Sequence, residues 1–309
     1  MLRLVVTRLF GGAVVVLGVA TLCFFLLHAA PGGPFDTEAK TSAAVAQAMR
    51  ERYHLDEPVV VQYLRYLGGL ARGDLGASLK QPRSVTELVR AHLPVSARLG
   101  ALALVFAVLF GVGLGVLAAW RHRTWIDRSA RTAAFASLSL PAFVVGPLLI
   151  SLFAMRLGVL PPARVDGWSS YLLPACALGL LYAGVLARLS RAGMLEVLDQ
   201  DFIRTARAKG LAERAVLWRH AARLGLVPAL TFLGPATAAL ISGSFVVEKI
   251  FQVPGLGYYF LGSISDRDYP VTVGVFLFYV ALLVVANLLV DLAHALLDPR
   301  LRLRQEARS

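Results

Sequence analysis

Six long apolar stretches recur along this sequence, and they constrain its fold more than any other feature. A helix that crosses the hydrocarbon core of a bilayer needs about 20 mostly apolar residues, which matches the length of these stretches. Charged residues make up only 16% of the chain, whereas soluble domains carry about a quarter. We therefore expect an all-α polytopic membrane protein with about six transmembrane helices. The stretches are 9–30, 98–119, 131–156, 171–189, 226–247 and 271–294.

Two of these stretches need a closer look. The first follows Arg3 and Arg8 and ends near Pro31, which is compatible with a cleaved signal peptide or with a transmembrane helix. Its length of about 22 residues is long for the apolar core of a signal peptide, so we expect an uncleaved helix. The third contains Pro141 and Pro147, which we expect to kink the helix or to open it toward a cavity.

The distribution of basic residues predicts the orientation in the membrane. The net charge of +12 comes from residues between the apolar stretches, which favours a cytoplasmic membrane face over nucleic-acid binding. With the N-terminus inside, the inner segments 1–8, 120–131, 188–225 and 295–309 carry 2, 4, 8 and 4 basic residues. The short outer segments 157–170 and 250–270 carry one each. We therefore expect both termini in the cytoplasm.

The remaining outer segment, 31–97, is long and nearly balanced, with 8 basic and 7 acidic residues. Its pattern predicts a helix over Asp36–Tyr53 and a second helix that Pro58 opens after a cap at Asp56. We expect an ordered external helical subdomain, in which the second helix ends at Gly73. Its apolar face would comprise Val59, Tyr63, Leu64, Leu67 and Leu70.

Motifs for catalysis and nucleotide binding are absent from the sequence. It contains no GxxxxGK[ST], HExxH, GxSxG or CxxC pattern, and its six histidines are scattered. Gly111, Gly113 and Gly115 lie in an apolar stretch, where they favour close helix packing over nucleotide binding. Asp291 is a single acid near the end of the last stretch, so no proton relay is indicated. We expect no enzyme activity, no metal site and no cofactor in this chain.

A basic hairpin follows the fourth stretch. Its spacing predicts one helix over about Gln200–Lys209, capped by Asp199 and ended by Gly210, and a second over about Glu213–Leu224. Phe202, Ala206 and the aliphatic part of Lys209 would share one face, and Arg204 and Arg207 would point elsewhere. The residues alone leave two alternatives. The hairpin lies on anionic headgroups, or its short helix enters a groove of a partner protein.

The segment Arg204-Thr-Ala-Arg-Ala-Lys-Gly210, followed by Leu-Val-Pro228, resembles the loop motif of ABC-importer permeases. Arg204 and Thr205 replace the first two residues of the general form, which begins Glu-Ala-Ala, and this replacement is usual in the branch for dipeptides, oligopeptides and nickel. The resemblance covers the whole chain, and within the branch it is greatest to the B-type membrane subunit of oligopeptide permeases. The other matching segments are 29–35, 53–58, 73–76, 93–100, 253–257, 267–270 and 297–300.

This resemblance implies a type I ABC importer permease fold with a helical external insertion after the first helix. It implies a bacterial inner-membrane subunit that imports oligopeptides, together with a related permease, two ATPase subunits that bind ATP and Mg, and an external peptide-binding protein. The alternatives are a permease for dipeptides, glutathione or nickel and metal chelates, or a protein of another class, a stand-alone channel or scaffold. The residues that would couple to the ATPase are Arg204, Thr205, Ala206, Arg207, Ala208, Lys209 and Gly210.

We expect four regions: the tail and first helix at 1–30, the external subdomain at 31–97, the permease core at 98–297 and a cytoplasmic tail at 298–309. The core would include the coupling loop 190–224 and the external loop 250–270. Residues 36–75 and 250–270 would receive the binding protein, with a tight turn at Pro254-Gly255-Leu256-Gly257 or a plain loop there. Candidate residues for the translocation path are Ser137, Ser139, Thr231, Thr237, Ser242, Ser244 and Asn287.

Overall fold

The computed structural model describes residues 2–29, 57–163, 167–241 and 244–297, and in these ranges helices joined by loops are the regular structure, with one isolated bridge between Ala77 and Ser84. The predicted helix over Asp36–Tyr53 and the cap at Asp56 lie outside the described residues. The chain divides into two compact units, residues 1–95 with 254–288 and residues 96–253 with 289–309. The predicted boundary after residue 97 falls inside one helix, α4.

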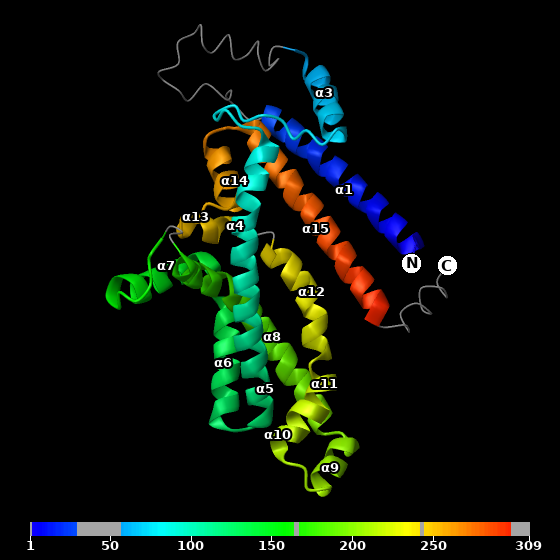
Figure 1. Ribbon diagram of the computed structural model, residues 1–309, viewed down its shortest axis with the longest axis vertical. Coiled ribbons are helices and arrows are strands. Elements are labelled where there is room, and N and C mark those ends of the chain that lie inside the picture. The colour runs from blue at the N-terminus through cyan, green and yellow to red at the C-terminus, as the bar shows by residue number, and fades with distance from the viewer. Residues whose placement is uncertain (1, 30–56, 164–166, 242–243, 298–309) are drawn as a thin grey trace. The chain divides into compact units, whose positions relative to one another are not determined.

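The first unit is built around the N-terminal and C-terminal long helices (Figure 1). Its buried centre is formed by Ala20, Val273 and Leu277, against which α3 packs. The hydroxyls of Thr21 on α1 and Tyr63 on α3 lie 2.7 Å apart, and burial raises the pKa of the neighbouring Tyr66 hydroxyl. The helices of this unit are α1 (Leu2–Ala29), α3 (Val59–Ala71), the start of α4 (Val85–Phe106), α14 (Leu256–Ser265) and α15 (Tyr269–Leu297).

The second external helix is confirmed, but its predicted apolar face is partly wrong. Tyr66 and Leu70 pack onto the core of the unit, whereas Leu64 is 62% exposed. The difference follows from α3 lying on α1 through its tyrosine rings, since the rings of both Tyr63 and Tyr66 contact that of Phe24.

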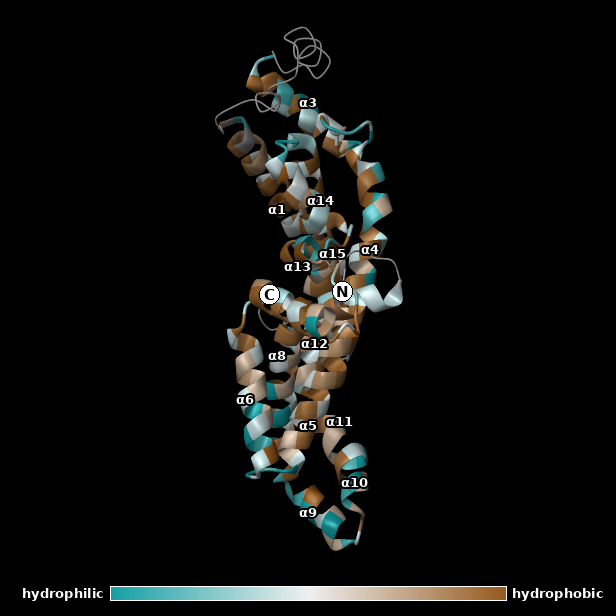
Figure 2. Cartoon of the chain, turned by 90° about the vertical axis from the view of Figure 1, so that its left-hand side faces the viewer, coloured by the Kyte–Doolittle hydropathy of each residue, from teal (hydrophilic) through white to brown (hydrophobic). Residues whose placement is uncertain are grey.

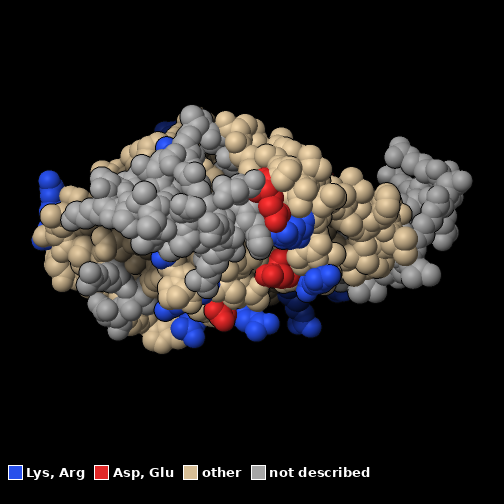
Figure 3. Space-filling model, turned by 90° about the horizontal axis from the view of Figure 1, so that it is seen from above, with Lys and Arg blue, Asp and Glu red and all other residues tan. Residues whose placement is uncertain are grey.

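Charged side chains of both signs lie beside one another on the described surface seen in Figure 3.

A buried carboxylate fixes the start of α15 within the first unit. Asp268 is 3% exposed and accepts hydrogen bonds from the Ser78 hydroxyl and, at 3.2 Å, from the backbone N–H of Leu79. A third, longer contact of 3.5 Å comes from the N–H of Val271 in the first turn of α15. Asp268 therefore satisfies helix donors that would otherwise be unpaired and ties the loop before α4 to α15.

The second unit surrounds one long helix, α8 (Leu172–Leu198), which packs against η1, α5, α6, α7, α11 and α12 (Figure 1). Three segments of this unit are π-helical, η1 (Ala107–Val112), η2 (Ile150–Arg156) and η4 (Val216–Ala221). The other elements are α5 (Gly113–Trp120), α6 (Trp125–Ser139), α7 (Ala142–Leu149), η3 (Trp168–Tyr171), α9 (Asp201–Ala208), α10 (Glu213–Ala215), α11 (Ala222–Gly225), α12 (Val227–Ile241) and α13 (Phe245–Ile250).

The prediction of about six membrane spans is confirmed in part by continuous helices and in part by bent pairs. Four helices are long and apolar enough to cross a membrane: Val5–Leu26, Val85–Trp120, Trp168–Leu198 and Tyr269–Leu289. The third predicted stretch is not one helix, because α6 and α7 meet at 109° at Pro141, where the predicted kink is confirmed. The fifth is also shorter than predicted, since α12 ends at Ile241 and α13 is a separate short helix.

Glycines bring α8 into backbone contact with its neighbours. A Cβ atom built on Gly111 would lie 2.6 Å from the carbonyl oxygen of Ala183, and one on Gly115 would lie 2.5 Å from that of Ala187. Since real side chains do not approach this closely, only glycine permits this helix separation. The predicted close packing is confirmed for these two glycines but not for Gly113, whose Cβ would meet nothing within 4 Å.

We expect Gly115→Ala to destabilise the protein by about 1–3 kcal/mol, because the added methyl group must push α5 away from α8. Thermal unfolding of the detergent-solubilised protein measures the effect. Gly113→Ala is the matched control on the same helix and should be neutral or stabilising by up to about 1 kcal/mol. Equal unfolding temperatures for the two variants would contradict the packing described.

Candidate functional site

The basic hairpin, residues 199–225, follows α8 directly. Its first helix, α9, matches the predicted helix, but the predicted cap at Asp199 is wrong, because Gln200 precedes the helix and makes no side-chain cap. At the other end Gly210 has a φ of +78°, and the N–H groups of Gly210 and Leu211 donate to the carbonyls of Arg207 and Ala206. This pattern is a Schellman motif, so the predicted role of Gly210 in ending the helix is confirmed.

The buried face of α9 differs from the predicted face in two of its three residues, Phe202 and Lys209. Ile203 is fully buried and Ala206 is 6% exposed, whereas Phe202 is 38% exposed and Lys209 is also exposed. Ile203 and Ala206 belong to a cluster with residues of α5, α8, η4 and α11. The other buried members of this cluster are Val116, Ala119, Met194, Val197, Val216, Leu217, Ala221 and Ala222.

The polar face of α9 points away from this cluster. Arg204 pairs with Asp201 at 3.2 Å, and Arg207 pairs with Glu213 of α10 at 2.7 Å. Both pairs are solvent-accessible, and hydrophilic residues gather on α9 and α10 in Figure 2. Of the seven predicted coupling residues, only Ala206 is buried, and the other six are exposed.

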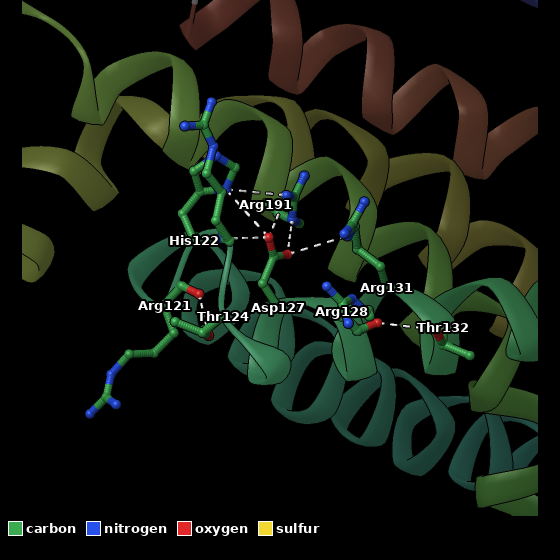
Figure 4. Close-up of polar contacts among 9 residues, drawn as sticks. Arg121, His122, Thr124, Asp127, Arg128, Arg131, Thr132 and Arg191 are labelled. Atoms are coloured by element: carbon green, nitrogen blue, oxygen red, sulfur yellow. Dashed lines mark hydrogen bonds and ion pairs between the residues drawn. The ribbon is translucent and has the colours of Figure 1, made fainter.

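A cluster of charged side chains lies near the connection between α5 and α6 (Figure 4). Asp127 is 1% exposed, and its carboxylate accepts two hydrogen bonds from the Arg191 guanidinium at 2.7 and 3.0 Å. The N–H of Arg123 donates to it at 3.0 Å, and His122 and Arg131 lie 3.4 and 3.5 Å from its oxygens. Asp127 therefore attaches α6 and the connection before it to α8.

Sequence reasoning missed this cluster. The available signal was composition, because Asp127 is the only acidic residue in the basic segment 120–131. A lone carboxylate among four arginines is a natural ion-pair centre, but its partner Arg191 lies in another helix, 64 positions later. Only the packing of α6 on α8 brings the two together.

A cavity of 450 Å³ lies where α6 bends into α7, beside α8 and α13. It is lined by two of the predicted path residues, Ser139 and Ser244, together with Tyr182 of α8. Ser139 donates to the Phe135 carbonyl at 3.0 Å, and Ser244 caps α13 by accepting from Val247 N–H at 3.3 Å. The remaining lining is mainly apolar, which gives the cavity few fixed polar contacts.

The other predicted path residues do not line this cavity. Ser137, Thr231 and Thr237 donate to carbonyls of their own helices. Asn287 is exposed on α15 of the other unit. Ser242 lies outside the described residues.

A buried carboxylate next to the cavity was also missed. Glu248 of α13 is fully buried, and the Ser96 hydroxyl of α4 donates to it at 2.8 Å. Buried ionisable residues in membrane helices are costly and usually serve a function. The sequence signal was Glu248 itself, which directly follows the predicted stretch 226–247.

The segment Pro254–Gly257 is an anchored helix start rather than the predicted tight turn. Leu256 and Gly257 form the first turn of α14, and Gly255, Leu256 and Gly257 are buried. The Nδ1 atom of His92 lies 2.7 Å from the carbonyl oxygen of Pro254. The reversal of the chain lies earlier, at Gln252, where φ is +52°.

No group of three or more histidine, cysteine, aspartate or glutamate side chains that could hold a metal ion occurs among the described residues. Two family models match the sequence. Residues 111–303 match the binding-protein-dependent transport system inner membrane component, and residues 1–100 match the N-terminal membrane component of the same systems. Together these matches cover nearly the whole chain.

Curated proteins and solved structures agree with these matches. The chain is 42% identical to the dipeptide transport system permease protein of Bacillus subtilis, over 99% of this chain and 100% of that protein. It is 39% identical to the oligopeptide transport system permease protein of Salmonella typhimurium, over 98% and 100%. A crystal structure of an amino acid ABC transporter with histidines has a TM-score of 0.54 at 19% identity, covering 68% of this chain and 94% of that one.

We expect Asp127→Asn to lower stability by about 3–5 kcal/mol, because the largely buried Arg191 guanidinium loses its counter-charge while the side-chain size is kept. Thermal unfolding in detergent reports the change. Asp201→Asn is the matched control. It removes the carboxylate of the exposed Arg204–Asp201 pair and should leave the unfolding temperature unchanged. A stable Asp127→Asn variant would show that the cluster does not hold α6 to α8.

Proposed function

Because this chain belongs to the binding-protein-dependent transport system inner membrane component family, we propose that it forms half of the translocation path of an ATP-driven peptide importer. A second related permease would supply the other half. Two separate ATPase subunits would bind ATP and Mg, and an external binding protein would deliver the peptide. The protein would lie in a bacterial inner membrane with both termini in the cytoplasm, as the basic residues of its short loops favour.

The observation that carries the proposal is the orientation of α9. Two of its apolar residues, Ile203 and Ala206, are buried in the permease itself, its charged residues are turned outward, and Phe202 is its one large apolar side chain that is exposed. A helix that only rested on lipid would turn its apolar face toward the bilayer. The arrangement instead supports docking of the polar face against another protein, through arginines that suit carboxylate partners.

The buried side of α9 suits the transmission of movement. Ile203 packs with Val116 of α5, Met194 of α8 and Val216 of η4 in one cluster. Because packed cores transmit displacement rather than absorb it, a shift of α9 by an ATPase would carry these helices with it. The α8 helix then links the hairpin to the cavity at Tyr182, since both lie on the same continuous helix.

The substrate class follows from the relatives and fits the cavity. Both curated relatives described above are named as peptide permeases, one for dipeptides and one for oligopeptides. Serine hydroxyls among apolar side chains, as at Ser139 and Ser244, would make few strong contacts with a passing chain. Such a lining suits peptides of varied sequence, and we propose oligopeptides as the main substrates, with dipeptides as the alternative that the Bacillus subtilis relative supports.

The external side would receive the binding protein through the described residues 57–75 and the segment 250–270. Gly255, Leu256 and Gly257 are buried and would support this surface from below. Pro254 is the most accessible of the four residues. The hydrogen bond between His92 and the Pro254 carbonyl would keep this base fixed.

We expect Arg207→Glu to reduce peptide transport by about tenfold or more, because it places two carboxylates together and reverses a charge of the docking surface. The charge swap Arg207→Glu with Glu213→Arg separates the two causes, since it restores the internal pair but not the charge pattern offered to the ATPase. If the swap remains defective in peptide-stimulated ATP hydrolysis, Arg207 acts on the partner. Full recovery in the swap would limit Arg207 to a local role, and copurification of ATPase subunits with each variant serves as the assembly control.

Substrate choice is tested by competition. Proteoliposomes that contain the assembled importer and its binding protein should take up a labelled tripeptide, and unlabelled tri- to pentapeptides should compete for uptake. Dipeptides should compete poorly and nickel not at all. Stronger competition by dipeptides would support the alternative substrate, and competition by nickel alone would exclude peptide import.

A further inference from the structure

A groove with an unusual lining lies between α5, α6 and α8 in the second unit. It encloses 250 Å³ and is lined largely by small or apolar residues, among them Leu114, Ala118, Ala134 and Phe135. Three arginines also line it, Arg131 of α6 and Arg188 and Arg191 of α8. We refer to it as the α5–α6–α8 groove. Its combination of an apolar wall and several guanidinium groups is suited to an amphipathic anion.

The positive charge of the groove is not balanced from within. Asp127 pairs with Arg191 through both of its oxygens and with Arg131 at 3.5 Å, so one carboxylate serves two arginines. Arg188 makes no ion pair or hydrogen bond with any residue that the structure describes. At least two positive charges therefore remain at the groove, one of them on a guanidinium without a protein partner.

The position of Arg188 makes this imbalance significant. Arg188 lies within the apolar candidate span Trp168–Leu198, three residues before Arg191, so the two arginines are neighbours on one face of α8 about 4.5 Å apart along its axis. The distribution of basic residues places Arg188 at the cytoplasmic end of this helix, where its exposed guanidinium can reach the headgroup region and meet an anion. A single phosphate placed between Arg188 and Arg191 would satisfy both.

We propose that the α5–α6–α8 groove binds an anionic phospholipid of the surrounding membrane. The lipid phosphate would lie against Arg188 and the outer side of Arg191, and an acyl chain would run along the apolar wall beside Phe135. Basic pockets between transmembrane helices at the cytoplasmic side are suited to anionic headgroups. This side of the protein is the cytoplasmic one in the orientation that its basic loops predict.

The open wall of the groove supports a lipid as the occupant. Phe135 is 72% exposed and Leu114 is 36% exposed, so aromatic and aliphatic surface borders the charged end directly. An acidic protein partner would need carboxylates at the arginines and apolar residues immediately beside them at membrane depth. A phospholipid carries its anionic phosphate directly next to its apolar acyl chains, and phospholipid surrounds the protein wherever it is inserted in a membrane. The bound lipid would hold α6 on α8 together with Asp127.

The test uses the importer complex purified from mixed vesicles of phosphatidylglycerol and phosphatidylcholine with identical acyl chains. Native mass spectrometry counts the lipids that remain bound. We expect the wild-type complex to retain phosphatidylglycerol preferentially, and Arg188→Gln to reduce that retention by about tenfold. Arg128→Gln removes the same charge from an exposed position on α6 outside the groove and should preserve the wild-type preference.

A second variant guards against a folding defect in Arg188→Gln. Ala134→Leu narrows the apolar wall without changing any charge, and it should also reduce retained phosphatidylglycerol while thermal unfolding in lipid-free detergent stays unchanged. Equal retention of the two lipids, or unchanged retention in Arg188→Gln, would overturn the proposal. Photocrosslinking from position 135 to another protein subunit rather than to lipid would also overturn it, because the groove would then be a subunit interface.

Discussion

Direct backbone contact along α8 is the constraint on which the second unit depends. The carbonyls of Ala183 and Ala187 occupy the space that side chains at Gly111 and Gly115 would need, so α8 has one permitted position against η1 and α5. In a bilayer this contact is favoured by dispersion and packing, because lipid offers no hydrophobic drive to helix association. The α6 helix packs on α8 and the basic hairpin follows directly from its end, so the position of α8 also sets the positions of these two segments.

Carboxylates provide the second level of organisation, and each does so locally. Asp268 joins a loop to the start of α15, Asp127 joins α6 to α8, and Glu248 joins α13 to α4. Each is nearly or fully buried and hydrogen-bonded, which offsets the cost of removing an ionisable group from water. Because these contacts are directional, they fix which short elements lie where, whereas apolar packing alone would tolerate sliding.

The sequence was sufficient for the features that depend on local chemistry. Apolar length predicted the spans, Pro141 predicted the bend, and Gly210 predicted the helix end, where the positive φ favours glycine. The buried face of α9 was not predictable in the same way, because Ala206 pairs equally well with Phe202 four residues before it and with Ile203 three before it. The packing of Ile203 with α5, α8, η4 and α11 is what determines that Ile203, and not Phe202, is buried. Likewise, Asp127 and Glu248 gained meaning only when helices distant in sequence brought Arg191 and Ser96 to them.

The same reasoning limits how the hairpin can recognise an ATPase. Since Ile203 and Ala206 are buried within the permease, an ATPase partner would meet mainly arginine, lysine and threonine, with Phe202 as the one large apolar side chain of α9 that is exposed. Its affinity would therefore come chiefly from charge and shape rather than from buried apolar area. Arg207 is already paired with Glu213, so a partner carboxylate gains the difference between two ion pairs and not a whole one. In the proposed importer, a modest net gain would suit a contact that is loaded in each transport cycle, because the packing of Ile203 and Ala206 on the other side of α9 holds this helix in the permease.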